Sequence, residues 1–446
     1  MAQSFKFTVH VHGALLIQPK TTTPYEFKYL SNIDDQLGLR NHIPFIHFFS
    51  HNPSLSSQDP VITIREALGR ALVYYYPLAG RLRNGVRGKL VVECNGEGVR
   101  FVEAEANVSL REITAACGET LKPPFPCLDK LLVDDVWGPS CITDSPLLRV
   151  QVTRLLCGGF VLAYTFNHCM CDAFGALQFM TTASLFARNP NLPSLSNSPT
   201  WAREALTPRD PPRITLPHPE YHDPNEGLTN PPLFSEAHFK HLVQNSYFFS
   251  KADLSTLKRK AHNAPTFDAV ASCLWRARTK ALGLEGDLRL LFPIDTRLRC
   301  SPPLPNGYYG TAVVFVCARV DANALCRPEG LANAARLISG AKREVDDEYR
   351  ASVIDLLELR GRREFGREGV FVVSDQSRLA FAGVDFGWGR AVYAGAARAG
   401  TGPVPGMVTS IVGHNGGVVA LVSLEREQVG AFEEAVREDL RPDAKL

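Results

Sequence analysis

The chain has 446 residues, of which 45% are hydrophobic and 21% charged, and its formal net charge is +2. This composition is that of an ordinary globular protein, and the length suggests two or three domains with room for a site between them. A nucleic-acid-binding protein usually carries a basic excess, which this chain lacks, so we expect no nucleic-acid partner.

The cysteine content indicates a reducing compartment. There are 11 cysteines, an odd number, and none of them forms a C-x-x-C pair. The first residues lack the apolar run of a signal peptide, and no stretch of about 18 apolar residues could cross a membrane. We therefore predict a cytoplasmic protein with no membrane span.

Helices and strands alternate through the first half of the chain. Apolar residues spaced by three and four indicate helices, whereas short apolar runs around glycine-rich turns indicate β-hairpins. In chain order the pattern predicts a helix at 64–75, a β-hairpin of strands 90–94 and 99–102 around Asn95-Gly96-Glu97-Gly98, a second hairpin of strands 149–155 and 160–166 around Gly158-Gly159, and a helix at 173–187.

A proline-rich segment separates the two halves. Residues 189–230 are dense in Pro, Ser, Thr and Asn, and proline breaks both helices and strands, so we expect a long crossover there. After this segment the pattern predicts strands at 244–249, 288–292, 311–320, 370–374 and 418–424 and helices at 252–262, 267–281, 330–345, 346–360 and 427–440. The predicted architecture is therefore two mixed α/β halves joined by a crossover.

The first candidate for chemistry is the run Asn167-His168-Cys169-Met170-Cys171-Asp172, which ends an apolar strand and opens a helix. Catalytic side chains often occupy such junctions, and histidine can accept a proton near neutral pH. Asp172 suits a helix N-cap. Taken alone, the pattern fits either a catalytic histidine or a core histidine beside an N-cap aspartate. Cys169 and Cys171 are best interpreted as packing residues, with a reactive or metal-binding pair as the alternative.

The second candidate is Asp385-Phe386-Gly387-Trp388-Gly389. Two glycines around a tryptophan indicate a close approach of the backbone or a positive φ. Taken alone, a turn at a strand end with a buried tryptophan is the better interpretation.

Together the two motifs resemble those of the plant BAHD acyltransferases, which transfer acyl groups from coenzyme A thioesters. The resemblance extends over nearly the whole chain and includes Thr23-Pro24, Leu30-Ser31-Asn32-Ile33-Asp34, Tyr76-Pro77-Leu78-Ala79-Gly80-Arg81 and Gly307-Tyr308-Tyr309-Gly310. One branch of the family, the alcohol acyltransferases and benzyl alcohol O-benzoyltransferases, is most similar in the segments Leu90 to Gly98, Arg209 to Thr215 and Leu359 to Arg362. That branch also includes members that acylate amines.

The resemblance implies an α/β fold of two chloramphenicol-acetyltransferase-like domains, each with mixed sheets and helices. We expect an N-terminal domain over 1–188, with about 384–405 crossing back to it, a crossover loop over 189–230 and a C-terminal domain over 231–446. In the family a tunnel runs between the domains, and the motif histidine lies at its centre.

The resemblance also implies roles for the motif residues. His168 would be the general base that takes the proton of the acceptor as it attacks the thioester, in a direct transfer without an acyl-enzyme. Asp172 would be structural. In the family the second-motif aspartate pairs with an arginine of the other domain, so a structural role is implied for Asp385, Gly387, Trp388, Gly389 and Arg297.

The implied co-substrate is acyl-CoA, and we expect no permanently bound cofactor and no metal. Family members often hold coenzyme A by a hydroxyl residue that opens a helix and by basic residues nearby. The matching candidates are Thr266, which opens a helix, and the basic residues Lys258, Arg259 and Lys260, although a solvated helix face explains the basic ones equally well. Ser374 is a further candidate, because the stretch Ser374 to Arg378 matches one that lines the tunnel in the family, and it could donate to the oxyanion or the thioester. The run from His218 to His222 superficially suggests a metal, but Pro219 disfavours a regular helix there.

The sequence leaves the acceptor open. We predict transfer of an aromatic or aliphatic acyl group, of benzoyl, cinnamoyl or short-chain type, to a small alcohol by a monomer in plant secondary metabolism. The alternatives are an N-acyltransferase that forms amides and an inactive relative that only binds ligands. Two positions depart from the family: Thr311 stands where many members have Asn, and Gln376 lies in a stretch where hydroxycinnamoyl-shikimate-type members carry Trp. The second departure gives no support to a polar ring acid as acceptor.

Overall fold

The computed structural model describes residues 5–118, 120–133, 142–221, 242–361, 369–400 and 408–442. The first of its two units contains residues 1–207, 304–312 and 379–403, and the second contains residues 208–303, 313–378 and 404–446. Each unit is built on a six-stranded sheet with helices, so the predicted α/β fold class is confirmed. The pattern in the sequence does not predict that 304–312 belongs with the first unit.

The domain limits expected at 188 and 231 stay predictions. Parts of other predictions lie outside the described residues, namely His222, Arg362, residues 222–230 of the crossover and residues 401–405 of the segment that crosses back.

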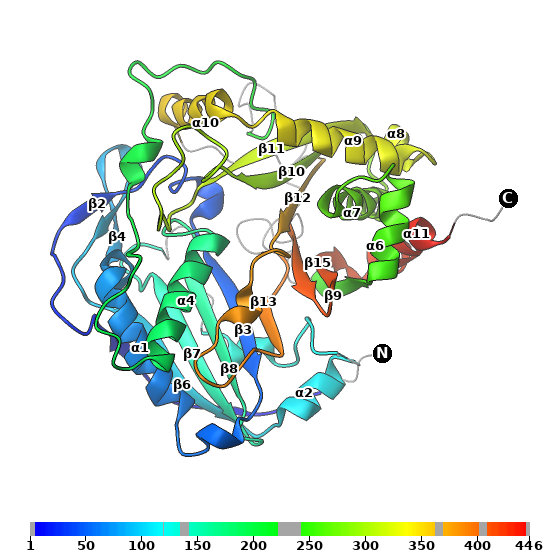
Figure 1. The fold of residues 1–446 in the computed structure, drawn as a ribbon. Coiled ribbons are helices and arrows are strands. Elements are labelled where there is room, and N and C mark those ends of the chain that lie inside the picture. Colours follow the sequence, from blue (N-terminus) through cyan, green and yellow to red (C-terminus); the bar gives the residue numbers. More distant parts are fainter. Residues whose placement is uncertain are drawn as a thin grey trace. The chain divides into compact units, whose positions relative to one another are not determined.

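The first unit has a mixed sheet of strand order β1-β6-β7-β8-β3-β13. Neighbouring strands are antiparallel except β6 and β7, which run parallel. The strands are β1 (Val9–Ile17), β3 (His42–Phe49), β6 (Val99–Ala106), β7 (Leu148–Leu155), β8 (Phe160–Asn167) and β13 (Tyr393–Ala396). Although β13 comes from late in the chain, it pairs with β3 at the edge of this sheet (Figure 1).

Two long helices pack side by side against this sheet, α1 (Pro60–Tyr74) and α4 (Ala173–Arg188) (Figure 1). The carboxylate of Asp59 caps α1 by accepting from Val61 N, and a proline at the first helical position loses no hydrogen bond. Every residue of β8 is buried, as expected of an inner strand that is covered on both faces. Two shorter helices belong to the same unit, α2 (Leu110–Ala116) and α3 (Leu128–Leu131).

The first predicted hairpin is wrong. β5 (Leu90–Glu93) pairs with β2 (Phe27–Tyr29) and β4 (Arg81–Asn84) in a separate three-stranded sheet, whereas β6 belongs to the six-stranded sheet. The linker carries the chain between the sheets, and Gly98 adopts φ +103° where a Cβ would lie 2.4 Å from Ile17 O. Glycines permit both a tight hairpin turn and a passage from one sheet to the other. The strands with which β5 and β6 pair decide which of the two forms. The second predicted hairpin is confirmed as β7 and β8.

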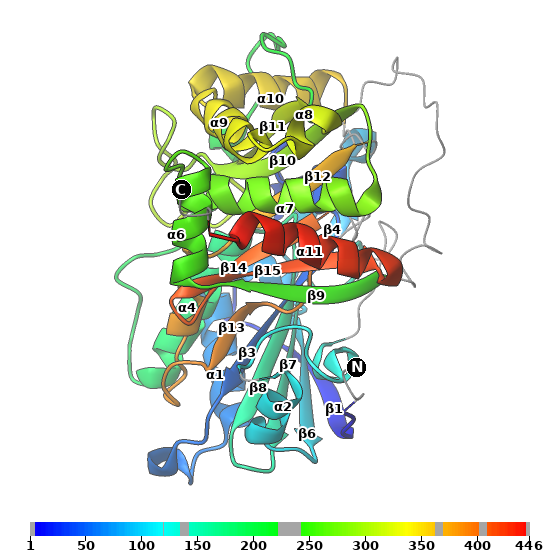
Figure 2. The same ribbon diagram turned by 90° about the vertical axis from the view of Figure 1, so that its right-hand side faces the viewer.

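The second unit has a sheet of strand order β11-β10-β12-β14-β15-β9, in which β12 runs parallel to both neighbours. The strands are β9 (Leu242–Phe249), β10 (Asp287–Asp295), β11 (Val313–Asp321), β12 (Val370–Asp375), β14 (Val408–His414) and β15 (Gly417–Glu425). The helices are α6 (Lys251–Lys260), α7 (Thr266–Leu282), α8 (Ala322–Cys326), α9 (Gly330–Arg343), α10 (Asp347–Leu359) and α11 (Val429–Leu440). The buried helix α7 lies between α9 and α11 (Figure 2).

All strands and helices predicted in the second half are confirmed to within a few residues at their ends. Among the described residues, the strands that the sequence pattern does not predict are β1, β2, β3, β4, β13 and β14. The strand β1 is an edge strand exposed along most of its length, and the alternation of apolar and polar residues in Val9–His12 does not continue through Gly13–Ile17. None of the helices in the described ranges is long and apolar enough to cross a membrane.

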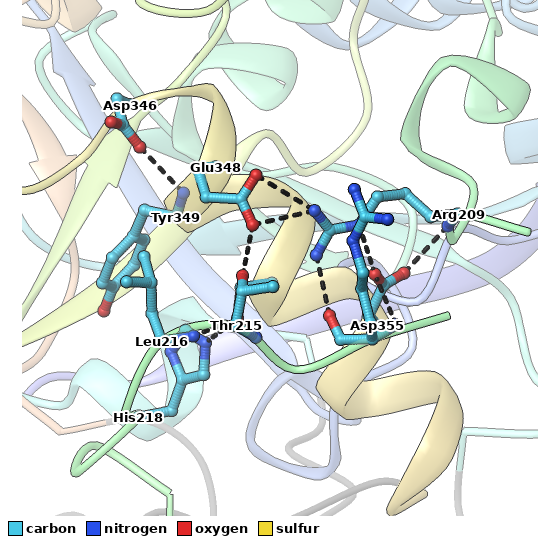
Figure 3. A network of polar contacts seen from close by, with 10 residues as sticks. Arg209, Thr215, Leu216, His218, Asp346, Glu348, Tyr349 and Asp355 are labelled. Atoms are coloured by element: carbon cyan, nitrogen blue, oxygen red, sulfur yellow. Dashed lines mark hydrogen bonds and ion pairs between the residues drawn. The ribbon is translucent and has the colours of Figure 1, made fainter. Parts of the chain in front are cut away.

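The later part of the crossover is anchored on α10 within the second unit (Figure 3). The fully buried carboxylate of Asp355 accepts hydrogen bonds from Arg209 N at 2.8 Å, Arg209 Nε at 2.6 Å and Arg213 N at 3.0 Å. Glu348, whose side chain is 46% exposed, holds the far end of the Arg209 guanidinium at 2.8 and 3.0 Å. Irregular backbone inside a protein needs such acceptors, because an unpaired buried N–H is costly.

A second group on α10 continues the anchor (Figure 3). The buried Ser352 hydroxyl accepts from the amides of Thr215 and Leu216, each at 3.1 Å. It also contacts His218 Nε2 at 2.8 Å, while His218 Nδ1 contacts Glu220 at 2.9 Å. Both ring nitrogens of His218, which the sequence raised as a possible metal ligand, are therefore used in hydrogen bonds that hold the crossover.

Replacing the buried acceptor is expected to weaken this anchor. Asp355→Ala leaves two main-chain amides and Nε of Arg209 without their acceptor, so the free energy of unfolding should fall by about 3 kcal/mol. Urea denaturation followed by circular dichroism measures this change. Glu348→Ala is the matched control, because it removes a more exposed partner of the same arginine and should lower the free energy of unfolding clearly less. Equal losses in the two variants would contradict the anchor.

Candidate active site

His168 lies directly after the last residue of the buried strand β8. The turn that follows is held by Asn167, whose carbonyl accepts from Met170 N at 2.9 Å and whose side-chain oxygen accepts from Cys169 N at 3.0 Å. The main chain of His168 is bonded on both sides. Its N–H donates to Asn41 O at 2.8 Å, and its carbonyl accepts from the Thr311 hydroxyl at 3.2 Å. The main chain that carries the imidazole is therefore held by three separate segments of the first unit.

The imidazole of His168 is partly exposed, but its Nδ1 atom is buried. Burial lowers the pKa of His168 below its ordinary value of 6.5, because the charged ring loses water. Main-chain carbonyls of His168 and Cys171 and the carboxylates of Asp172 and Asp34 oppose this shift, since they favour the protonated ring. The net effect is a histidine that is neutral over a wider pH range than a free one.

Asp172 is the N-cap of α4, as the sequence predicts. Its Oδ1 accepts from Gly175 N at 3.0 Å, and its Oδ2 accepts from Ala312 N at 3.1 Å. Both carboxylate oxygens thus bind main-chain amides. Asp172 therefore ties the start of α4 to the segment 304–312.

Two buried charges beside this loop are absent from the site predicted from the sequence. The Asp34 carboxylate is fully buried and lies 3.1 Å from Nε of Arg203, whose side chain is only 3% exposed. Asp34 also accepts from Thr311 N at 2.9 Å and from Ser31 N at 3.0 Å. Arg203 donates from Nη2 to Met170 O at 2.7 Å. Burial raises the pKa of Asp34, and the nearby guanidinium and hydrogen bonds oppose that shift.

The segment Gly307-Tyr308-Tyr309-Gly310 packs against the same loop. The Arg203 guanidinium lies 4.0 Å from the ring centre of Trp201, 5.1 Å from that of Tyr308 and 5.0 Å from that of Tyr309, within range for cation–π contacts. A Cβ at Gly310 would lie 2.3 Å from the guanidinium carbon, so a larger residue there would have to displace the buried guanidinium. Close packing against the Arg203 guanidinium thus explains why two aromatic residues and a glycine stand together in this segment.

The second motif forms a turn before β13, at the other end of β8 from His168. Oδ1 of Asp385 accepts from Gly387 N at 2.7 Å and from Gly389 N at 2.8 Å, and both glycines have positive φ, +113° and +89°. Trp388 is buried edge-on against Phe160, the first residue of β8, with ring centres 5.3 Å apart. At about 3.3 Å per residue, the length of β8 separates this turn from His168 by roughly 25 Å.

The candidates for coenzyme A all belong to the second unit. Thr266 is the first residue of α7, and the three basic candidates Lys258, Arg259 and Lys260 form the last turn of α6, so a short loop joins them. Ser374 is on a different element, near the end of β12.

Arg297 contacts Asp295 at 3.2 Å within the second unit. The pairing of Arg297 with Asp385 would join the two units and stays a prediction.

Neither cysteine of the first motif forms a disulfide. Cys169 and Cys171 are buried and unoxidised, and Cys169 N is part of the turn after β8. Across the described ranges, no group of three or more His, Cys, Asp or Glu side chains is placed to hold a metal ion.

A histidine at the end of a central strand, followed by an N-cap aspartate in one of two α/β units, is the arrangement expected for the acyltransferase family that the motifs resemble. The sequence matches the family model described as "Transferase family" over residues 7–439, and the chain belongs to this family, the BAHD acyltransferases.

Relatives and a solved structure agree with this assignment. The benzyl alcohol O-benzoyltransferase of Petunia hybrida is 42% identical over 453 residues, which cover 99% of this chain and 95% of that protein. The 13-hydroxylupanine O-tigloyltransferase of Lupinus albus is 42% identical over 445 residues, covering 97% and 94%. The crystal structure of vinorine synthase matches with a TM-score of 0.72 at 21% identity, covers 95% of this chain and 96% of that one, and shows the same fold.

Removing Asp385 is expected to affect stability more than chemistry. In Asp385→Ala, two main-chain amides at the turn lose their acceptor, so the free energy of unfolding should fall by about 1–3 kcal/mol. Denaturation curves and steady-state rates on the same preparation test this. A variant with wild-type stability and a slowed chemical step would contradict a structural role for this turn.

Proposed function

We propose that this protein is an acyl-CoA-dependent O-acyltransferase, which transfers an aromatic or aliphatic acyl group to a small alcohol with His168 as general base. The observation that carries the proposal is the position of His168 itself, fixed by main-chain hydrogen bonds on both sides and followed by its N-cap aspartate. The relatives named above support transfer to oxygen, because both are O-acyltransferases by name. Amide formation has no comparable support among them.

The proposed reaction needs a base but no covalent intermediate. The alcohol oxygen attacks the thioester carbonyl while a ring nitrogen of His168 removes its proton. The tetrahedral intermediate then collapses, the carbon–sulfur bond breaks, and the imidazolium returns the proton to the coenzyme A thiolate. Because Nδ1 is buried, we assign proton transfer to Nε2. The lowered pKa keeps the ring neutral, which is the form that accepts a proton.

The remaining assignments are part of the same proposal. Asp172 and the second motif are structural, with Arg297 as the partner of Asp385. Ser374 donates to the oxyanion or the thioester, and Thr266 with the basic turn of α6 binds the coenzyme A phosphates. We retain the domain limits given above. None of the cysteines within the described ranges forms a disulfide, which supports a cytoplasmic enzyme. The proposed enzyme acts as a monomer.

A donor-by-acceptor screen tests the proposal. The purified protein is incubated with benzoyl-, cinnamoyl- or short-chain acyl-CoA and separate panels of alcohols and amines, and products are read by mass spectrometry. Esters are expected. His168→Ala should lower kcat by about 10²–10⁴-fold without unfolding the protein. His10→Ala, at an exposed histidine of β1, is the matched control and should change nothing.

The other outcomes of the screen are equally informative. Amides without esters would favour the N-acyltransferase. Bound coenzyme A without any product would favour an inactive relative. Full activity of His168→Ala would overturn the assignment of the base.

The pH dependence follows from the lowered pKa of His168. A protonated ring cannot accept a proton, so kcat/KM should fall as the pH drops through the pKa of His168 in the unliganded enzyme. Since burial lowers this pKa, the midpoint of the fall is expected below pH 6.5. A pH–rate profile with a substrate whose chemical step limits the rate measures it. A midpoint above 6.5 would contradict the environment described for His168.

A further inference from the structure

The loop that carries His168 is held by a buried ion pair, which the stability of the fold alone does not require. The pair of Asp34 and Arg203 is almost completely removed from water. Buried ion pairs contribute little net stability, and apolar residues of similar volume often replace them without loss. The contribution of the pair to stability therefore does not explain why it lies beside the loop that carries His168.

The pair lies at the centre of the contacts made by the His168 loop. The carbonyl of Met170 accepts from Arg203, and the carbonyl of His168 accepts from the Thr311 hydroxyl. Asp34 binds both donor residues, through the side chain of Arg203 and the main-chain N–H of Thr311. One carboxylate thus orders two segments that are far apart in sequence, and each of them holds a carbonyl of the same loop.

The geometry leaves little freedom in this arrangement. The Arg203 side chain is only 3% exposed and packs against three aromatic rings, and Gly310 has no Cβ that would collide with its guanidinium. Thr311 is fully buried. Proton transfer requires the base to lie within a few tenths of an ångström of its productive position, and a misplacement of about 1 Å can cost about 10²-fold in rate.

We propose that Asp34, together with Arg203 and Thr311, positions His168 for proton transfer. These are positioning residues, which act on the reaction through the main chain of the loop and do not touch the substrate. The inference rests on the proposed role of His168. Thr311 is of particular interest because many family members have Asn at this position, so here the hydroxyl of a threonine makes the contact to the loop.

The decisive variants are at Thr311. Thr311→Val removes the hydroxyl that reaches His168 O, while it keeps the shape of the side chain and the main-chain N–H that binds Asp34. We expect kcat to fall by about tenfold, with KM for both substrates changed less than about threefold. Thr311→Ser retains the hydroxyl and is expected to recover most of kcat. A packing role alone predicts no such recovery, because serine loses the methyl group that valine keeps.

Asp34→Asn tests the centre of the network, and Asp439→Asn is its matched control. Arg276 and Asp439 form a comparably buried pair in the second unit, with side chains 7% and 5% exposed. Both substitutions should lower the denaturation midpoint, but only Asp34→Asn is expected to lower kcat, by about 10²-fold. If Asp34→Asn does not fold, the two variants at Thr311 decide the question.

The outcomes separate this inference from the proposed function. If Thr311→Val keeps wild-type kcat, or if Thr311→Ser fails to recover it, the positioning role is wrong even though His168 is the base. If Asp34→Asn loses no more kcat than Asp439→Asn at equal stability, the role is wrong as well. If His168→Ala keeps full activity, the proposed function itself fails, whatever the other variants do.

Discussion

Irregular backbone inside a fold must find hydrogen-bond partners, and in this protein buried aspartates supply many of them. Asp172 binds the amides of Gly175 and Ala312, and Asp355 binds those of Arg209 and Arg213. Asp34 and the half-buried Asp385 do the same for other segments. A short carboxylate can accept from two amides at once, so it can fix a turn where no helix or sheet ladder is available. The loop that carries His168 depends on such hydrogen bonds between aspartate carboxylates and main-chain amides.

This constraint also explains why the two sequence motifs differ in role. Both contain an aspartate that binds main-chain amides, but they lie at opposite ends of β8. Asp172 fixes a loop whose histidine is partly exposed. Asp385 fixes a turn whose tryptophan packs on the core. Both motifs stand out in the sequence because each contains an aspartate that binds main-chain amides. Only the first motif also carries a side chain suited to proton transfer, the imidazole of His168.

The long periodic elements could be predicted from the sequence, whereas pairing between distant segments could not. Helices such as α4 and α7 follow from apolar spacing, because their own residues determine which face is buried. The predicted hairpin around Gly96 and Gly98 failed because a glycine-rich linker fits either a hairpin or a passage between sheets. The strand β3 contains a proline and two histidines, and its burial depends on β8 and β13, which lie far away in the chain.

The candidate site shows the same limit. His168 and Asp172 could be recognised because their chemistry and spacing lie within six residues. Asp34 and Arg203 could not, since a charged side chain in a sequence is expected to be exposed unless its partner is known. The only available signal was the position of Asp34 in a segment that resembles the family.

Burial of Asp34 and Arg203 requires that the two residues meet, and their meeting requires the segment 304–312 to return to the first unit. That return is a property of the whole chain. The segment brings Thr311 to the carbonyl of His168 and Ala312 to the carboxylate of Asp172, so it contacts both ends of the first motif. A single short stretch, delivered from the second half of the sequence, therefore completes the loop. Any substitution that shifts this stretch should disturb His168 before it disturbs the sheet. Among the contacts described above, only this stretch donates to the carbonyl of His168 and to Oδ2 of Asp172.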